Sequence, residues 1–282
     1  MIYAIPLAGE MGAGIGAALV RSGNTVLTCV EGRSQATRLR AVDAGMQDAS
    51  FTDLARADII LSIVPPSLAL DMAKNIAQAM PDGAAPLYVD LNAVNPQTVR
   101  QIEAALPDSV RFADGSIIGA APKTSDAKIP RFYVSGPAAG EALALRDHGL
   151  DIEPLDGGTG AASALKMCYG ALTKGNAALT AAILMAAERE GVGAALHAEM
   201  EDSQRARLTA AENFIPSVYA KAYRWVAEME HIAAFLGENR AEAGIWASAA
   251  TFYQHMADDY EGDRAEIDAI DRFLARDDKL RR

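Results

Sequence analysis

The pattern of hydrophobic positions changes near Asp156, and the two halves of the chain predict different structures. Before that residue, short apolar runs rich in β-branched residues alternate with segments whose apolar residues have a helical period. The apolar runs predict strands at Ile2–Leu7, Thr25–Cys29, Ile59–Val64, Leu87–Asp90, Val110–Asp114, Arg131–Val134 and Leu150–Pro154. The helical segments include Gly12–Arg21, Gln35–Ala44, Leu68–Ala79 and Pro96–Leu106. This alternation is typical of a mainly parallel sheet covered by helices on both faces.

From Ala161 onward the strand pattern is absent and the chain is expected to be helical. Residues 161–190 have helically spaced apolar side chains and no proline over about eight turns. We therefore expect an α/β domain over residues 1–156 and an all-helical domain over residues 157–282. The length of 282 residues agrees with two domains, since one hydrophobic core seldom organises so many.

Composition narrows the class of function. The net charge of −11 argues against a nucleic-acid partner, because phosphate binding requires clustered Lys and Arg. Neither a membrane span nor a secretion signal is expected, because no long apolar run and no leader pattern is found. Two distant cysteines, Cys29 and Cys168, argue against a disulfide framework, and four histidines without H-x-x-x-H spacing predict no metal site. We expect a metal-free protein of a reducing cytoplasm.

The stretch "IPLAGEMGAGIGAALV", which begins at Ile5, predicts a strand, a glycine loop and a helix. In a dinucleotide-binding loop of the form G-x-G-x-x-G, the middle glycine admits the pyrophosphate and the last one allows close packing of helix on strand. Gly9 and Gly12 occupy these two positions, whereas Leu7 stands where the first glycine is expected. Taken alone, the stretch fits a dinucleotide loop and an ordinary helix-opening turn about equally well.

The end of the second predicted strand bears on the choice of cofactor. An acidic residue there binds a free ribose 2′-hydroxyl, and an arginine binds a 2′-phosphate. The segment "CVEGRSQA" offers both, because Glu31 follows Gly12 by 19 residues and Arg33 and Ser34 come directly after it. Ser34 also suits the N-cap of the next helix. The pair Arg33–Ser34 favours NADP, with NAD as the alternative.

Five motifs in order resemble those of the β-hydroxyacid dehydrogenases, relatives of 6-phosphogluconate dehydrogenase, and in particular a branch with a DUF1932 C-terminal domain. The motifs are "AGEMG" with Gly9, Glu10, Met11 and Gly12, "IVPP" at Ile63–Pro66, "VDLNAVNP" at Val89–Pro96, "DGSIIGAAP" at Asp114–Pro122, and Gly157 and Gly160 followed by Lys166. The resemblance covers nearly the whole chain and favours the dinucleotide reading of the opening loop. It implies a Rossmann domain followed by an all-α 6-phosphogluconate dehydrogenase-like domain.

The resemblance also implies roles for individual residues. Lys166 matches the catalytic lysine. The residues expected to bind the cofactor are Gly9, Glu10, Met11, Gly12, Glu31, Arg33, Ser34, Val64, Pro65, Pro66 and Asn92. Those expected to bind the substrate are Ile118, Gly119, Tyr169, Gly170, Thr173 and Lys174. Besides Leu7, the departures from the family include Ala162 in place of a glycine, Ile118 in place of a serine and Gly170 in place of an asparagine. Loss of the last two polar side chains leaves the substrate open.

A lysine near a carbonyl oxygen can donate a proton as hydride transfer places charge on that oxygen. We expect Lys166, at the start of the long helix, to project into the cleft between the domains, with Tyr169, Gly170, Thr173 and Lys174 on the same face. The favoured function is therefore an NAD(P)-dependent dehydrogenase or reductase that acts on a small hydroxy acid or carbonyl. An imine reductase and a dinucleotide-binding sensor without turnover remain alternatives.

Partners follow from the same pattern. We expect a small-molecule substrate and a homodimer formed through the helical domain. An anionic substrate group would have to meet a basic side chain, the possibilities being Lys123, Lys128, Arg131 and Lys174. The segment Ala222–Leu236 carries Arg224, Glu228 and His231 at helical spacing, and these fit either a binding role or amphipathic packing.

Overall fold

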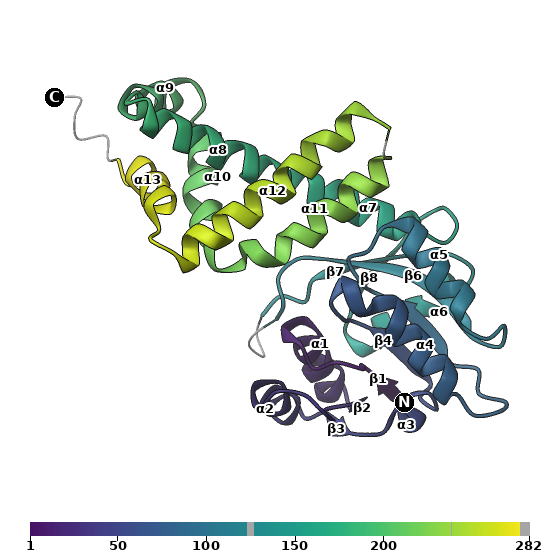
Figure 1. The fold of residues 1–282 in the computed structure, drawn as a ribbon. Coiled ribbons are helices and arrows are strands. Elements are labelled where there is room, and N and C mark those ends of the chain that lie inside the picture. Colours follow the sequence, from purple (N-terminus) through teal and green to yellow (C-terminus); the bar gives the residue numbers. More distant parts are fainter. Residues whose placement is uncertain (123–126, 238, 277–282) are drawn as a thin grey trace. The chain divides into compact units, whose positions relative to one another are not determined.

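The computed structural model describes residues 1–122, 127–237 and 239–276. The chain forms two compact units, Met1–Met167 and Cys168–Arg282 (Figure 1). The division between them falls within helix α7 (Ala161–Gly170), after the last strand of the sheet has ended.

The first unit is built on an eight-stranded sheet with the order β3-β2-β1-β4-β5-β6-β7-β8. Neighbouring strands are parallel except β6 and β7, which are antiparallel. The strands are β1 (Ile2–Ala4), β2 (Thr25–Thr28), β3 (Gln47–Asp48), β4 (Ile59–Ser62), β5 (Leu87–Asp90), β6 (Arg111–Ile118), β7 (Arg131–Ser135) and β8 (Asp151–Pro154). The predicted α/β fold is confirmed, and β3 is the strand that the apolar pattern missed, because both of its residues are exposed.

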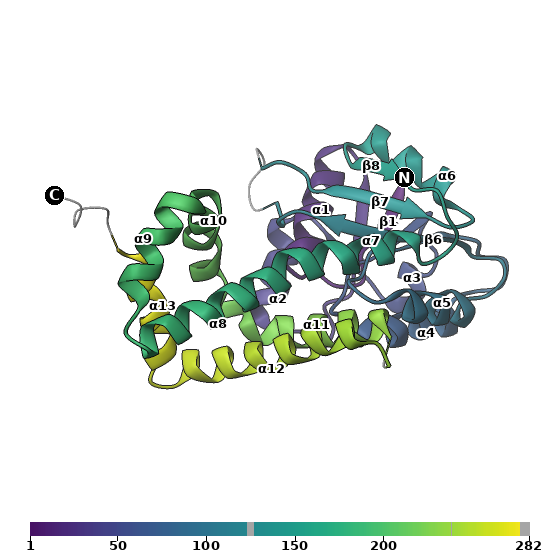
Figure 2. The ribbon, with the colours of Figure 1, turned by 90° about the horizontal axis from the view of Figure 1, so that it is seen from above.

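Alternation along the strands produces a hydrophobic layer on each face of this sheet. Ile59 and Leu61 belong to the core on one face, and Ile60 belongs to the core on the other. The first face is covered by α1 (Glu10–Arg21), α2 (Gln35–Asp43) and α6 (Ala139–Ala142). The second is covered by α3 (Phe51–Leu54), α4 (Ala69–Ala79) and α5 (Pro96–Ala105). Figure 2 shows α4 and α5 together on one side of the sheet, with α6 on the other.

The described residues of the second unit form helices joined by loops. Its helices are α8 (Asn176–Arg189), α9 (Gly193–Ser203), α10 (Arg205–Phe214), α11 (Ala222–Leu236), α12 (Ala241–Glu261) and α13 (Ala265–Leu274). Helices α11 and α12 lie side by side in both views (Figures 1 and 2). Their core includes Trp225 and Tyr253, whose rings meet edge to face with centroids 5.2 Å apart. None of the helices in the described ranges is long and apolar enough to cross a membrane.

The long proline-free segment is one helical run, but it is not a single α-helix. A π-helical turn at Ala171–Gly175 separates α7 from α8. The carbonyl oxygens of this turn accept hydrogen bonds from α12: Trp246 Nε1 donates to Ala171 at 3.3 Å, and Tyr253 Oη donates to Lys174 at 2.6 Å. A π turn contains an extra residue relative to an α-helix, so helical faces on either side of it are out of phase.

Candidate functional site

The carboxyl ends of β1, β4 and β5 lie at one edge of the sheet, and the predicted cofactor residues follow them. Chain order reverses between β1 and β4, since β2 and β3 extend from one side of β1 and β4 and β5 from the other. In open α/β sheets, ligands bind outside the carboxyl ends of the strands at such a reversal. The opening loop follows β1, the turn Ile63–Pro66 follows β4, and Asn92 follows β5. The topology therefore brings these three segments to one edge.

The opening loop holds its two glycines for different reasons. A Cβ atom on Gly12 would lie 2.4 Å from the carbonyl oxygen of Leu7, so close packing of α1 on the end of the strand requires glycine. Gly9 is the N-cap of α1 with extended dihedral angles (φ −68°, ψ 179°), and a Cβ there would meet nothing within 4 Å. The Leu7 side chain is 7% exposed and packs in the core on the α4 side. Open space therefore remains beside Gly9, whereas the Leu7 side chain is part of the hydrophobic core.

The segment that follows β2 brings several basic side chains together. Ser34 caps α2 by accepting a hydrogen bond from the amide of Thr37 at 3.3 Å, and Glu31 is exposed. Arg33 is half-buried, and its buried Nε has no hydrogen-bond partner among the described residues. A buried guanidinium nitrogen without an acceptor is costly unless an anion is supplied.

Two further arginines lie beside this group. Arg38 Nε donates to the carbonyl oxygen of Arg33 at 3.2 Å, and Arg40 Nε donates to that of Ala8 at 3.1 Å. Arg40 therefore links α2 to the opening loop. The sequence reasoning missed both residues. Their places in α2, just after Arg33 in the sequence, were a visible signal, but only the tertiary structure brings Arg40, in the last turn of the helix, to Ala8.

Asn92 holds the turn that follows β4. Its Oδ1 accepts from the amide of Val64 at 2.7 Å, and its Nδ2 donates to Ser62 Oγ at 2.9 Å and to Asp90 Oδ1 at 2.5 Å. Asn92 is 2% exposed. Its amide is committed to the protein, whereas Val64 and Pro66 are half-buried and Pro65 is exposed. Asn92 therefore acts on this edge through the position of the Val64–Pro66 turn.

Asp90 anchors the other end of that hydrogen-bond network inside the sheet. It is fully buried, and its Oδ2 has no hydrogen-bond partner in the described structure. Burial raises the pKa of Asp90 to about 7, the hydrogen bond from Asn92 opposes the rise, and the negative charge of Asp114 adds to it. Asp114 is the residue that pairs with Asp90 across β5 and β6.

Asp114 caps α7 from the sheet. Its Oδ2 accepts from the amides of Gly160 at 2.9 Å and Ser163 at 3.1 Å, and its Oδ1 accepts from Ser163 Oγ at 2.6 Å. Ser135 on β7 donates to Asp114 at 3.0 Å and accepts from the amide of Ala162 at 3.0 Å. Gly160 has a φ of 107°, which favours glycine. These bonds fix the first turn of α7 to two strands.

Lys166 lies one turn beyond this cap. Lys166 Nζ donates to the carbonyl oxygen of Ile117 at 2.5 Å, near the carboxyl end of β6, and the side chain is half-buried. Ile118 and Gly119 come next, half-buried and exposed respectively. Since β6 is parallel to β5, Lys166, Ile118 and Gly119 lie at the same edge of the sheet as the opening loop.

The remaining predicted substrate residues belong to the helical unit. Tyr169 is 47% exposed, and Thr173 Oγ1 donates to the carbonyl oxygen of Tyr169 at 2.9 Å. Gly170 is buried, with space for a Cβ 3.6 Å from Ile232. Thr173 and Lys174 lie in the π turn itself, where the rotation per residue differs from that of an α-helix.

Two of the other basic residues considered for an anionic substrate, Lys174 and Arg131, have protein partners. Lys174 is paired with Glu228 and lies over the Trp225 ring, with Nζ 5.0 Å from its centroid. Arg131 pairs with Asp151 at 3.1 Å. Lys128 is exposed, and Lys123 lies outside the described residues.

The segment Ala222–Leu236 carries residues to which the sequence assigned no role. Glu228 is the partner of Lys174, and Arg224 Nε donates to Tyr223 Oη at 2.8 Å. His231 is half-buried, and burial lowers its pKa. The pair of Glu228 with Lys174 links α11 to the π turn, whereas the bond between Arg224 and Tyr223 lies within α11.

Comparisons with known proteins agree with this architecture. The domain of unknown function DUF1932 matches residues 187–256. The conserved protein MTH1747, of unknown function and structurally similar to 3-hydroxyacid dehydrogenases, is 27% identical over 93% of this chain and 98% of its own, with a TM-score of 0.72. The 3-hydroxyisobutyrate dehydrogenase of Mycobacterium tuberculosis is 19% identical over 97% of this chain and 99% of its own, with a TM-score of 0.71.

A third similar structure has a different activity. An imine reductase of Myxococcus stipitatus, in a complex with NAD+, is 19% identical over 97% of this chain and 99% of its own, with a TM-score of 0.54. No curated protein sequence matches the chain. The chain thus carries a DUF1932 domain and has the fold of the 3-hydroxyacid dehydrogenases, as its motifs predicted.

Proposed function

We propose that this protein is an oxidoreductase that uses a nicotinamide dinucleotide, preferably NADP, to interconvert a small carbonyl compound and its alcohol. A hydroxy acid is the expected class of alcohol. The observation that carries the proposal is that a glycine loop, a helix N-terminus and Lys166 occur at one carboxyl edge of a parallel sheet.

The opening loop suits a pyrophosphate. Gly9 leaves open space where a side chain would stand, and the amides of the first turn of α1 lie directly after it. Such amides, together with the helix dipole, favour a bound phosphate. Gly12 keeps α1 close to the strand end. Glu10 and Met11 form the first turn beside this space.

The arginines beyond β2 favour the 2′-phosphate of NADP over the free ribose of NAD. Arg33 has a buried Nε without a partner in the described structure, and Ser34 and Thr37 place hydroxyl groups 3.1 Å apart beside it. Phosphate oxygens accept hydrogen bonds from both kinds of group. Arg40 ties this group to the opening loop, so the two phosphate sites are held by one hydrogen-bonded frame.

Lys166 supplies the proton in the proposed reaction. The bound cofactor provides or accepts the hydride. During reduction, the ammonium of Lys166 transfers a proton to the carbonyl oxygen as negative charge develops there, and the neutral amine takes the proton back when the alcohol is oxidised. The bond from Lys166 Nζ to Ile117 holds the group at the end of β6. An imine reductase shares the fold, but a lysine placed to protonate an oxygen favours a carbonyl substrate.

We further propose that the helical unit forms a homodimer. Leu179 and Ile183 lie one turn apart on α8 and are 53% and 61% exposed, and Leu172 in the π turn is 64% exposed. Large apolar side chains gathered on one helical run are typical of a protein interface. A second copy of the chain is the partner that we expect there.

Cofactor binding tests the proposal most directly. A Gly9→Ala variant should keep its fold, because its Cβ meets no protein atom within 4 Å, and should lose NADPH affinity, because that Cβ enters the space assigned to the pyrophosphate. Gly140→Ala is the matched control, since Gly140 also has open space and lies in α6. NADPH fluorescence titration measures affinity, and circular dichroism checks the fold. Equal affinity in both variants would place the dinucleotide elsewhere.

A measurement of turnover distinguishes an enzyme from a dinucleotide-binding sensor. A panel of hydroxy acids and carbonyl compounds, followed through the absorbance of the reduced cofactor, should identify a substrate. Tight NADPH binding without turnover of any compound in the panel would favour the dinucleotide-binding sensor instead.

A further inference from the structure

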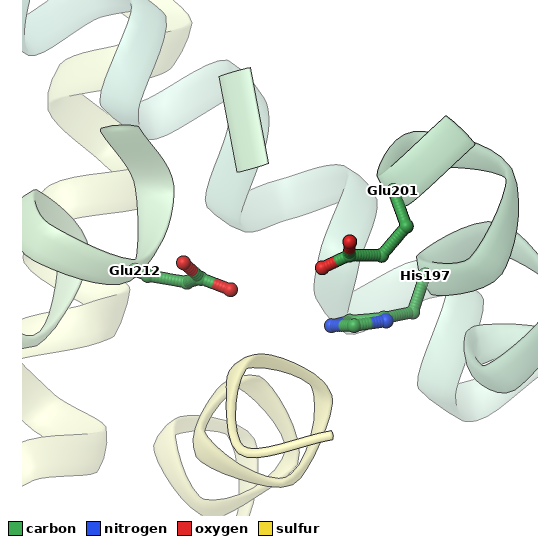
Figure 3. A group of neighbouring side chains, drawn as sticks. All are labelled: His197, Glu201 and Glu212. Carbon is green, nitrogen blue, oxygen red and sulfur yellow. The ribbon is translucent and has the colours of Figure 1, made fainter. Parts of the chain in front are cut away.

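The helical unit brings together metal-ligating side chains that the proposed oxidoreductase does not use. His197 and Glu201 lie one turn apart on α9, and Glu212 lies on α10. One possible ligand atom from each side chain lies within 4.8 Å of the others. Figure 3 shows the imidazole of His197 and both carboxylates directed toward a common space.

Packing fixes the orientation of the imidazole. His197 is only 5% exposed, and its ring meets that of Phe273 on α13 at an interplanar angle of 60°, with centroids 5.4 Å apart. A buried histidine held in one orientation by an aromatic ring is pre-organised as a ligand. The two glutamates are half-buried and approach the ring from different helices.

Charge also favours a cation at this point. Two carboxylates close to a buried imidazole carry negative charge that Arg205 offsets in part, through its ion pair with Glu201. That pair uses Oε2 of Glu201, and a carboxylate can bind a second cation through its other oxygen. Glu212 has an oxygen directed into the same space (Figure 3). A cation would offset the negative charge that remains.

The ligand set selects the class of metal. Imidazole with carboxylates suits Zn2+ and its first-row neighbours rather than Ca2+ or Mg2+, which prefer oxygen alone. Ligand distances of about 2.0–2.2 Å place tetrahedral ligand atoms about 3.3 Å apart. The present separations are at most 4.8 Å. Side-chain rotation that brings the three atoms closer by up to about 1.5 Å would close the site, and glutamate side chains have that freedom.

We propose that His197, Glu201 and Glu212 bind one divalent transition-metal ion, with Zn2+ expected and water completing its coordination. The ion would fasten α9 to α10, which are joined through Gln204 alone. The search for H-x-x-x-H pairs overlooked the group, because the second ligand on α9 is a glutamate and the third comes from the next helix. The site lies within the residues matched by the DUF1932 domain, so metal binding would be a property of that domain.

The test is metal titration of the full chain without a histidine tag. Isothermal titration with Zn2+ should give one site per chain, and Co2+ should give visible absorption bands typical of a site with nitrogen and oxygen ligands. His197→Phe keeps an aromatic ring against Phe273, and Glu212→Gln keeps the shape of a half-buried side chain. Each should weaken binding at least about tenfold and abolish the rise in melting temperature caused by the metal.

Two matched controls locate the site. Glu199→Gln changes an exposed carboxylate on the same helix, and His255→Gln changes the exposed histidine that pairs with Glu266. Both should bind Zn2+ like the wild type. The proposal is wrong if the wild type shows no saturable binding, if both site variants bind with unchanged affinity, or if only the His255 variant loses affinity. None of these measurements depends on turnover or on NADPH.

Discussion

The surroundings of Asp90 predict how the stability of the protein depends on pH. The carboxyl group is fully buried, has a pKa of about 7 in place of an ordinary value of 3.8, and faces Asp114 across the strand pair. Between these two pKa values the folded protein binds the proton that the unfolded chain has released. The free energy of unfolding therefore falls as pH rises from about 4 to about 7.

The size of this change in the free energy of unfolding follows from the pKa shift of Asp90. A difference of about three pKa units, at 1.36 kcal/mol per unit, corresponds to about 4 kcal/mol. Asp90→Asn removes the titration and keeps an oxygen that accepts the hydrogen bond from Asn92. The variant should thus gain stability relative to the wild type as pH rises, by about 3 kcal/mol between about pH 5 and about pH 8.

Urea unfolding at a series of pH values measures this difference, and titrations shared by both proteins cancel in it. Asp53→Asn is the control with the opposite sign. Hydrogen bonds from Ser50 lower the pKa of Asp53, so its contribution is present at neutral pH and is lost as pH falls through its lowered pKa. A stability difference between the wild type and the Asp90→Asn variant that stays constant with pH, or that grows toward acid, would refute the reasoning.

The remaining predictions concern the proposed function. Arg33→Ala should weaken the binding of NADPH by about 1.5–3 kcal/mol, as expected for a hydrogen bond to a charged group, and leave NADH affinity nearly unchanged. Equal losses of NADPH and NADH affinity in fluorescence titrations would favour a contact of Glu31 with a free ribose. Lys166→Met should lower kcat by about 10²–10⁴-fold while NADPH binding persists; a near-normal kcat would assign the proton to another group. Ile183→Glu should convert a dimer to a monomer in sedimentation velocity, and an unchanged mass would place the interface elsewhere.

The sheet could be predicted because its central strands, β4 and β5, are buried on both faces and therefore consist of nearly continuous apolar runs. Leu87–Asp90 has the predicted bounds, and Ile59–Val64 differs from β4 only at its end. Residues Gln47–Asp48 were missed because a short, exposed edge strand lacks that signal. The π turn was also hidden, since its residues keep a helical pattern and the side chains that bond to its carbonyl oxygens, Trp246 and Tyr253, lie far along the chain.

The residues of the candidate site also fall into those that the sequence could predict and those that it could not. The glycines of the opening loop could be read from local spacing, and the constraint on Gly12 is a contact with Leu7, only five residues earlier in the chain. The cap on α7 could not, since Asp114 and Ser163 are separated by 49 residues and meet only through the sheet. The grouping of His197, Glu201 and Glu212 could not be predicted for a related reason: side chains on two helices have no fixed spacing in the sequence.

The cap formed by Asp114 and Ser135 has a consequence for how such proteins can diversify. It fixes the turn of α7 that precedes Lys166 to the sheet, and Lys166 itself belongs to the first compact unit. The group proposed to move the proton therefore lies in the same compact unit as the opening loop. Substitutions in the helices after Met167 leave the lysine and its anchor in place. The substrate range of such a protein can change through those helices without loss of the proposed proton donor.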